Sequence, residues 1–459
     1  MTFKFNLTPQ QVPLVKTKYR EIKTMIPHPE SINVLNKISK YESSNVKDQL
    51  PVIWDKANGF NIYDKWGNSW IDFTSTIFVA NVGHAHPKIT EAIKKVSKKL
   101  LHSYSYPTEI RSLYLEKLIS FVPDYLNKAS LYSTGTEATE RAIKLARING
   151  IKKNSEKVVM IGWKGNYHGK TMGSQMMSGV ASDSNWVGYR DPNIFHLPFP
   201  YPWVLEDLKL SGEELFKQHL KILEKEYKIN LKNIAGFMTE TFQGWAAVFY
   251  PKSYIKALRE WCSKNGALLI FDEVQAGFAR CGKIFGYQHY EVEPDLVCCG
   301  KGISGGFPLS AVLGRGEIID LDPAYTSTHG GHPLACVSGL TTIEIIEEEN
   351  LIQQSIDKGK IMEKILSSWQ KKYPELIGNI YCKGLIAGVF IKNKLERDNL
   401  KLDINLCDKI VEKTMQKGVF IIRTGRGSLK FGPPLTITVE ALEEGLNTVE
   451  QSIKELADI

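Results

Sequence analysis

A lysine follows a short, almost entirely apolar run in the segment DLVCCGKG, Asp295 to Gly302. Lys301 is flanked by two glycines, which leave room for a bulky group to approach its side chain. A lysine in a desolvated place tends to have a lowered pKa, and its amine is then a usable nucleophile. The alternative is a lysine whose ammonium group extends from a strand end into solvent.

Two carboxylates end a second apolar run, LLIFDEV, Leu268 to Val274. A carboxylate at the end of a buried strand is costly unless it meets a partner. For Asp272, the protonated pyridine nitrogen of a ligand is one such partner, and an arginine in a structural ion pair is the alternative. Glu273 is expected to point the other way and to serve structure, because side chains alternate along a strand.

Two loops could hold other parts of a ligand. In YSTGTEATE, Tyr132 to Glu140, the amides of Gly135 and Thr136 precede a helix, and such amides can bind an anion. A plain N-cap is the alternative for this loop. In GNYHGKTMG, Tyr167 and His168 follow a strand, and an aromatic ring presented in this way can stack on a flat ligand. An ordinary surface turn is the alternative there.

The elements that must position these groups alternate between strands and helices from about residue 130 onward. The runs KVVMIGW, IAGFMTE, ALLIFDEV and DLVCCGKG are typical of strands covered on both faces, as in a parallel sheet. Helical segments such as Pro251 to Gly266 lie between them. This alternation predicts a large, doubly wound, mostly parallel α/β domain, whose ligands bind beyond the carboxyl ends of the strands. All four candidate features fall at such ends.

The rest of the chain predicts a smaller α+β domain. Residues 59–73 alternate around a turn, which is typical of a β-hairpin. Residues 339–373 have the pattern of one long helix, and two short strands and a final helix follow it. We therefore expect an N-terminal segment and hairpin (1–75) that joins the small domain, a large domain (76–335), and a C-terminal small domain (336–459).

Composition limits the classes of function. The formal net charge of +8 over 459 residues lacks the clustering of a nucleic-acid-binding fold, so we expect no nucleic-acid partner. We expect no signal peptide and no membrane partner, because no run of about 18 apolar residues occurs. The seven cysteines contain no CxxC pair. They predict reduced thiols in a cytoplasmic protein and no metal site.

The four features together are the parts needed to hold pyridoxal phosphate. The loop binds an anion, the aromatic side chain stacks on a ring, an acid pairs with a pyridinium nitrogen, and a lysine forms a Schiff base. The sequence therefore predicts a pyridoxal-phosphate enzyme with Lys301, Asp272 and Tyr167 as its catalytic residues.

The sequence resembles the class III aminotransferases, the ornithine/4-aminobutyrate aminotransferase family of fold type I pyridoxal-phosphate enzymes. The resemblance covers the chain from about Pro51 to its end. It rests on YDKWGNSWIDF, NVGHAHPKI, STGTEATERAIKLAR, YHG, ETFQG, IFDEVQAGFARCG, EPDLVCCGKGISGGFPLSAVLGR, THGGHPLAC and FGPPLTIT. It implies transfer of an amino group from an amine or amino-acid-like donor to an oxo acid, aldehyde or ketone acceptor, through an internal aldimine at Lys301.

The resemblance also implies a role for each residue of the cofactor site. Asp272 bonds the pyridine nitrogen, and Tyr167 and Val274 cover the two faces of the ring. Thr328 reaches the phosphate of the neighbouring subunit, so the resemblance implies a homodimer with shared active sites, within which a tetramer is an alternative. The full cofactor-binding set is Gly135, Thr136, Tyr167, His168, Glu240, Asp272, Val274, Gln275, Lys301 and Thr328.

Substrate recognition departs from the family pattern at two places. Trp245 stands where many members carry an acid, and Lys430 replaces the arginine of R-F-x-P-P-L that grips the α-carboxylate. A lysine offers a point charge rather than a bidentate fork. We therefore do not expect an ornithine- or 4-aminobutyrate-type substrate, and an amine, an amino sugar or an anionic amino compound is the hypothesis. The expected substrate residues are Phe78, Trp245, Arg423, Arg426 and Lys430, with Arg423 in the place of a mobile arginine.

Other reactions on the same scaffold remain open from the residues alone. A racemase or epimerase, an aminomutase, a decarboxylase and a lyase would all use Lys301 and Asp272. A binding protein without catalysis is a further alternative, against which the intact lysine, acid and phosphate loop argue.

Overall fold

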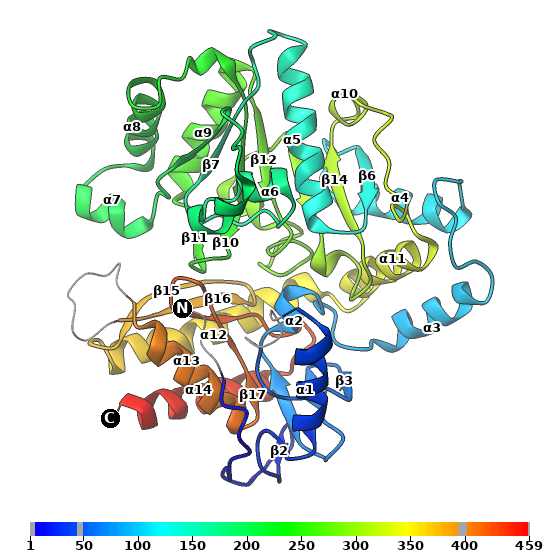
Figure 1. The fold of residues 1–459 in the computed structure, drawn as a ribbon, viewed down its shortest axis with the longest axis vertical. Helices are drawn as coiled ribbons and strands as arrows, with labels where there is room; N and C mark the ends of the chain where they lie inside the picture. Colours follow the sequence, from blue (N-terminus) through cyan, green and yellow to red (C-terminus); the bar gives the residue numbers. More distant parts are fainter. Residues whose placement is uncertain (1–4, 44–48, 393–401, 458–459) are drawn as a thin grey trace. The chain divides into compact units, whose positions relative to one another are not determined.

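The structure, a computed structural model, describes residues 5–43, 49–392 and 402–457. The chain forms two compact units. One unit is the segment Pro87–Ile352, and the other joins the chain up to His86 to the chain from Gln353 onward. Figure 1 shows the elements of both units, and each unit is described by itself.

A seven-stranded sheet lies at the centre of the segment Pro87–Ile352 (Figure 1). One strand, β14, is antiparallel to its two neighbours, and the other neighbouring pairs are parallel. This confirms the predicted mostly parallel α/β fold. The strand order is β6 (Lys128–Tyr132), β14 (Ser310–Gly314), β13 (Leu296–Cys299), β12 (Leu268–Asp272), β9 (Ile234–Glu240), β7 (Val159–Trp163) and β8 (Ile194–Leu197).

Helices α5 to α9 of this unit lie in the connections between its strands, α3 and α4 precede β6, and α10 and α11 follow β14. The apolar side of α5 packs over the sheet, where Ala138, Ala142 and Leu145 join Ile270 and Val312 in one buried cluster. The helices are α3 (Pro87–Ser97), α4 (Glu109–Phe121), α5 (Gly135–Ile151), α6 (Met172–Met177), α7 (Pro202–Leu208), α8 (Gly212–Lys225), α9 (Lys252–Asn265), α10 (Gly316–Ile319) and α11 (Pro333–Glu348).

The register of the parallel strands brings their carboxyl ends to one edge. Asp272, the last residue of β12, lies beside Glu240 at the end of β9 and beside Cys298 near the end of β13. Lys301 follows β13 by two residues. The acid and the lysine that the sequence separates by 29 positions are therefore neighbours in space.

The predicted long helix over 339–373 is wrong, because the chain breaks it into two. α11 ends at Glu348, and α12 spans Leu351–Lys372. Between them Asn350 has a φ of 51°, a left-handed conformation that interrupts a helix and that asparagine tolerates better than most residues. α11 packs against α3 and α4. One division between the units lies at 352/353, within the first turn of α12, and the other lies at 86/87, compared with the expected 335/336 and 75/76.

The second unit contains two sheets in which most neighbouring strands are antiparallel. In one, β17 (Val419–Phe420) pairs in parallel with β5, so the C-terminal chain extends the sheet of the N-terminal hairpin. That sheet also has β1 (Val15–Lys16), β2 (Glu21–Ile22), β3 (Lys56–Asn58), β4 (Asn61–Tyr63) and β5 (Ser69–Asp72). The other has the order β15 (Ile377–Lys383), β16 (Ile386–Ile391), β19 (Ser428–Phe431) and β18 (Ile422–Arg423). The helices are α1 (Ser31–Tyr41), α2 (Ser75–Phe78), α12, α13 (Ile404–Gln416) and α14 (Val439–Ala457).

Candidate active site

A cavity of about 280 Å³ lies at the carboxyl ends of β9, β12 and β13. It brings together every residue of the predicted cofactor-binding set except Thr328. Its lining is Thr134, Gly135, Thr136, Tyr167, His168, Gly169, Lys170, Glu240, Asp272, Val274, Gln275 and Lys301. A larger cavity of about 600 Å³ opens near Leu268, at the other end of β12, but its charged walls include residues already paired, such as Arg259 with Asp295.

Lys301 projects from a strained position directly after the strand. Its φ of 46° is left-handed, which is uncommon for a residue with a side chain and is typical of residues that a functional site holds in place. Burial lowers the pKa of the Lys301 ammonium, while the charges of Asp272 and Glu240 oppose this effect. The amine is therefore easier to deprotonate than an ordinary lysine, as a nucleophile or a base requires.

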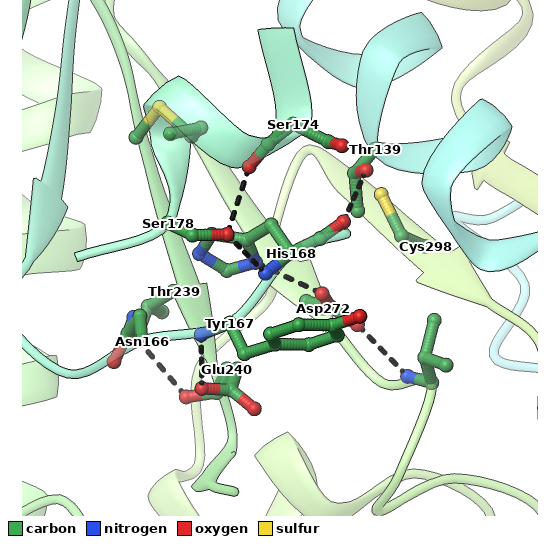
Figure 2. Close-up of polar contacts among 12 residues, drawn as sticks. Thr139, Asn166, Tyr167, His168, Ser174, Ser178, Thr239, Glu240, Asp272 and Cys298 are labelled. Carbon is green, nitrogen blue, oxygen red and sulfur yellow. Dashed lines mark hydrogen bonds and ion pairs between the residues drawn. The ribbon is translucent and has the colours of Figure 1, made fainter. Parts of the chain in front are cut away.

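Asp272 has a histidine as its partner rather than the arginine considered from sequence (Figure 2). Its Oδ2 lies 2.9 Å from His168 Nδ1, and its Oδ1 accepts a hydrogen bond of 3.0 Å from the Val274 amide. Asp272 is 6% exposed, and His168 is 2% exposed. A carboxylate this deeply placed is stabilised by such bonds, and one side of it still faces the cavity.

The backbone of His168 is fixed on both sides. Its amide donates to Ser178 Oγ at 2.8 Å, and its carbonyl accepts from the Thr139 hydroxyl at 2.7 Å (Figure 2). The second ring nitrogen, Nε2, is buried and has no hydrogen-bond partner among the described residues. Sequence reasoning missed Thr139 and Ser178, since nothing in their local sequence distinguishes them from ordinary helix residues.

Glu273 points away from the cavity, as strand alternation predicts. Its carboxylate accepts hydrogen bonds from the Thr241 hydroxyl and from the amides of Gly286 (2.9 Å) and Tyr287 (2.7 Å). Burial raises the pKa of the Glu273 carboxyl to about 7. The residue ties two loops to the end of β12, which is a structural role.

This raised pKa predicts that Glu273 makes the fold less stable as pH rises. Between the ordinary value of 4.5 and about 7, the unfolded chain loses the proton while the folded chain keeps it, so unfolding becomes easier. The effect amounts to about 3 kcal/mol in the free energy of unfolding between pH 5 and pH 8. Melting temperatures at the two pH values should fall less with rising pH in Glu273→Gln than in the wild type. An equal fall in both proteins would contradict the assignment.

The loop before α5 provides both an N-cap for the helix and residues that line the cavity, the two alternatives considered from its sequence. Thr134 is an N-cap in a capping box with Glu137, and Gly135 and Thr136 begin the helix and line the cavity. The first amides of a helix have no partner within it and favour an anion. The Thr136 hydroxyl lies 2.9 Å from Thr171 Oγ1 and 2.6 Å from Ser174 Oγ, so hydroxyl groups gather at this end of the cavity.

Tyr167 lies on the same edge and keeps 38% of its surface exposed. Its ring stands next to Asp272 in Figure 2. Its amide donates to Glu240 Oε2 at 2.9 Å. Glu240 is 3% exposed, and burial raises the pKa of its carboxyl to about 7, while the nearby His168 opposes that rise.

Trp245 is half-buried, in the turn after β10 (Phe242–Gln243). A Cβ atom built on Gly165 would lie 3.0 Å from its ring, so the indole packs closely on the loop that carries Tyr167. Gln275 packs on the neighbouring Gly244 in the same way. Thr328 is exposed and does not line the cavity, and its carbonyl lies 3.2 Å from His102 Nε2.

The other expected substrate residues lie in the second unit. Phe78 is buried at the end of a left-handed turn, and the Lys430 ammonium lies 4.8 Å from the centre of its ring. Arg423 forms an ion pair with the buried Asp408 and donates to the Thr424 carbonyl at 3.2 Å. The half-buried Arg426 lies in the turn before β19. Within this unit, Arg423 and Asp408 line a cavity of about 600 Å³ with largely apolar walls, such as Trp54, Ile77 and Phe420.

The fold is α/β, and a helix start, a buried acid and a lysine line one cavity at an edge of its sheet. The chain matches the family description Aminotransferase class-III over residues 42–453, and it belongs to this family. It is 30% identical to the acetylornithine aminotransferase of Caldanaerobacter subterraneus subsp. tengcongensis over 422 residues, 91% of this chain and 99% of that protein. It is 28% identical to the alanine/serine racemase of Pyrococcus horikoshii over 467 residues, 98% and 96% of the two chains.

A solved structure of the ornithine aminotransferase of Toxoplasma gondii, with partial occupancy of PLP at the active site, matches with a TM-score of 0.79. The identity is 25%, over 93% of this chain and 95% of that one. These findings confirm the predicted fold type I architecture and a pyridoxal-phosphate-dependent aminotransferase that uses an amino donor and an oxo-acid acceptor. Within the described ranges we find no helix with the length and apolar character needed to cross a membrane. The same ranges contain no group of three or more His, Cys, Asp or Glu side chains placed to hold a metal.

Proposed function

We propose that the 280 Å³ cavity is the pyridoxal-phosphate site and that Lys301 is its covalent anchor. The observation that carries this proposal is the meeting of Lys301 and Asp272 at one sheet edge, in a cavity whose opposite end is a helix start with clustered hydroxyls. The donor set fits the cofactor: amides and hydroxyls suit a phosphate, and a buried carboxylate suits a protonated ring nitrogen. Tyr167 and Val274 are the side chains that cover the ring faces.

Bound pyridoxal phosphate supplies an aldehyde carbon that forms a covalent bond with amines and a ring that accepts electron density. The residues of this chain do the rest. Asp272, oriented by His168, holds a proton at the ring nitrogen. The Lys301 amine, whose pKa is lowered, would take a proton from the donor carbon and pass it to the carbon that the cofactor supplies, which is general acid–base catalysis at Nζ. Gly135, Thr136 and Gln275 orient the cofactor.

We propose that the donor is an amine or amino compound of a different type from ornithine or 4-aminobutyrate. Lys430 stands in place of a bidentate arginine, and its ammonium lies against the Phe78 ring. Arg423 already forms an ion pair with Asp408, so an anionic donor that bound Arg423 would have to share the guanidinium group with that carboxylate. Arg426 and Trp245 are the remaining side chains assigned to the donor.

The same proposal includes a homodimer in the cytoplasm. Thr328 is exposed and outside the cavity of its own chain, which supports a role at the phosphate of a neighbouring subunit. All seven cysteines are free, as a reducing compartment permits.

The test of the proposed function is a two-step spectroscopic assay. The protein loaded with pyridoxal phosphate is mixed with L-alanine, L-ornithine, phosphoethanolamine or glucosamine 6-phosphate, and its visible absorbance is followed. Transamination predicts conversion to the aminated cofactor, reversed by pyruvate or 2-oxoglutarate. Release of ammonia or carbon dioxide without any aminated cofactor would refute it.

The similarity to the alanine/serine racemase of Pyrococcus horikoshii makes racemisation the second candidate. Racemisation would begin with the same proton abstraction by Lys301, but a proton would return to the opposite face of the same donor carbon, so no oxo acid is required. Loss of optical activity of L-alanine or L-serine in the absence of any acceptor would identify this reaction.

A further inference from the structure

Glu240 joins two separate loops through the two oxygens of one carboxylate. Oε2 accepts a hydrogen bond from the Tyr167 amide at 2.9 Å, and Oε1 accepts one from the Gly244 amide at 3.1 Å. We propose that Glu240 is a positioning residue that fixes the Tyr167 ring and the Trp245 ring relative to each other. It would act through the two backbone amides rather than by direct contact with a reacting atom. The inference rests on the proposed function, in which Tyr167 covers the cofactor and Trp245 faces the donor.

The place of Glu240 in the sheet makes it suitable for this task. It ends the fully buried strand β9 and lies beside Asp272 in the register of the parallel pair. Its side chain is 3% exposed and lines the cavity. Figure 2 shows the carboxyl group beside the backbone amide of Tyr167. In such a buried place, removing the acceptor of a hydrogen bond leaves its donor unsatisfied, which is costly. A strand end is also a more rigid support than either loop.

Further contacts join the same two loops. Gln243 Nε2 donates to the Lys164 carbonyl at 3.0 Å and to Asn166 Oδ1 at 3.3 Å. Gly165, with a φ of +84°, leaves just enough space for the Trp245 ring, since a Cβ there would lie 3.0 Å from it. The segments that carry Tyr167 and Trp245 are therefore packed together, and the Glu240 carboxyl group accepts a backbone amide from each of them.

Both oxygens of Glu240 are occupied by backbone amides, which argues against a direct proton-transfer role for this residue. A group that must donate or accept a proton needs an oxygen aimed at the reacting atom. The neighbouring Lys301 amine and the Asp272 carboxylate already face the cavity. Loss of the Glu240 carboxylate should consequently disturb geometry at two places at once, the cofactor face and the donor side.

Glu273 provides a matched control. It is also buried, it also follows a strand of the same sheet, and it also accepts two backbone amides, but those belong to Gly286 and Tyr287, outside the cavity. A general effect of removing a buried carboxylate would appear in both Glu240→Gln and Glu273→Gln. A positioning effect on Tyr167 and Trp245 would appear only in the Glu240 variants.

The first experiment is amide hydrogen exchange on the full chain without added cofactor, read by mass spectrometry. Glu240→Ala should raise exchange roughly tenfold in both segments, 164–170 and 242–248. Glu240→Gln keeps one acceptor oxygen and should raise exchange in one of them or both. Glu273→Gln should raise exchange around residues 285–288 instead. Unchanged exchange in both segments of the Glu240 variants, or the same pattern in Glu273→Gln, would overturn the proposal.

The second experiment adds pyridoxal phosphate to the same proteins. The dissociation constant of pyridoxal phosphate should rise roughly tenfold in Glu240→Ala, and the visible circular dichroism of the bound cofactor should change, because Tyr167 is no longer held. Glu273→Gln should retain the wild-type values. If the wild-type protein binds no pyridoxal phosphate, the proposed function fails, while the exchange experiment still decides the role of Glu240. Wild-type cofactor affinity and dichroism in both Glu240 variants would contradict the proposal.

Discussion

Replacing Lys301 with alanine should reduce transamination by roughly 10³- to 10⁴-fold. The amine lines the cavity beside Asp272, and burial lowers its pKa, so it is the group placed to bind the cofactor carbon and to move a proton. The variant should still bind pyridoxal phosphate through the loop of Gly135 and Thr136, but without a covalent bond to the protein. The visible absorbance of the covalently held cofactor should disappear, and single-turnover rates with a donor should fall by the stated factor.

Lys157 supplies the control for this experiment. It is also buried with a lowered pKa, but its ammonium donates to the carbonyls of Lys232 and Asn265, outside the cavity of Lys301. Lys157→Ala should lower the melting temperature and leave the absorbance and the rate per folded molecule unchanged. An unaltered visible spectrum in Lys301→Ala would exclude Lys301 as the covalent anchor.

The parts of the site that lie on strands could be predicted from sequence, and their side-chain partners could not. The sequences of β9, β12 and β13 are largely apolar, and this local pattern is enough to predict buried strands. Asp272 lies at the end of one of these strands and Lys301 just after the end of another, so both positions follow from the sequence. The partner of Asp272 is His168, 104 positions earlier, and only the parallel order of the strands brings the two together. The sequence could not exclude an arginine as the partner, because any cation satisfies a buried carboxylate in principle.

The ion pair of Arg423 with Asp408 escaped prediction for the same reason. Asp408 lies within α13, where an acid on a helix usually faces solvent, and its burial depends on the packing of that helix against the strands that carry Arg423. The sequence therefore predicts an anion-binding group of three cations, Arg423, Arg426 and Lys430. In the structure the first of them already has a carboxylate beside it, and the third lies against an aromatic ring.

The break between α11 and α12 contains one residue with a left-handed backbone, Asn350. Asn350 follows three glutamates, a residue type that favours helix. The apolar residues before and after it keep the spacing of a helix, so the pattern shows no interruption. The left-handed backbone of Asn350 nevertheless separates α11, which packs against α3 and α4, from α12, which begins at Leu351. A single left-handed asparagine is a weak signal in a sequence, because the same residue is also found inside helices.

Replacing Asp272 with asparagine should lower the turnover number by roughly 10- to 150-fold, since a hydrogen bond to a charged group in a buried site contributes about 1.5–3 kcal/mol. Asparagine keeps the shape and can still meet His168 and the Val274 amide, but it cannot hold a proton at the ring nitrogen by its charge. The covalent bond to Lys301 should form as before, so the visible absorbance should persist while the proton-transfer step slows. Single-turnover rates with a donor measure that step, and Glu273→Gln is the control because it removes the adjacent carboxylate, which faces away from the cavity. A wild-type turnover number in Asp272→Asn would show that the Asp272 charge is not used, and the buried pair with His168 would then have a structural role alone.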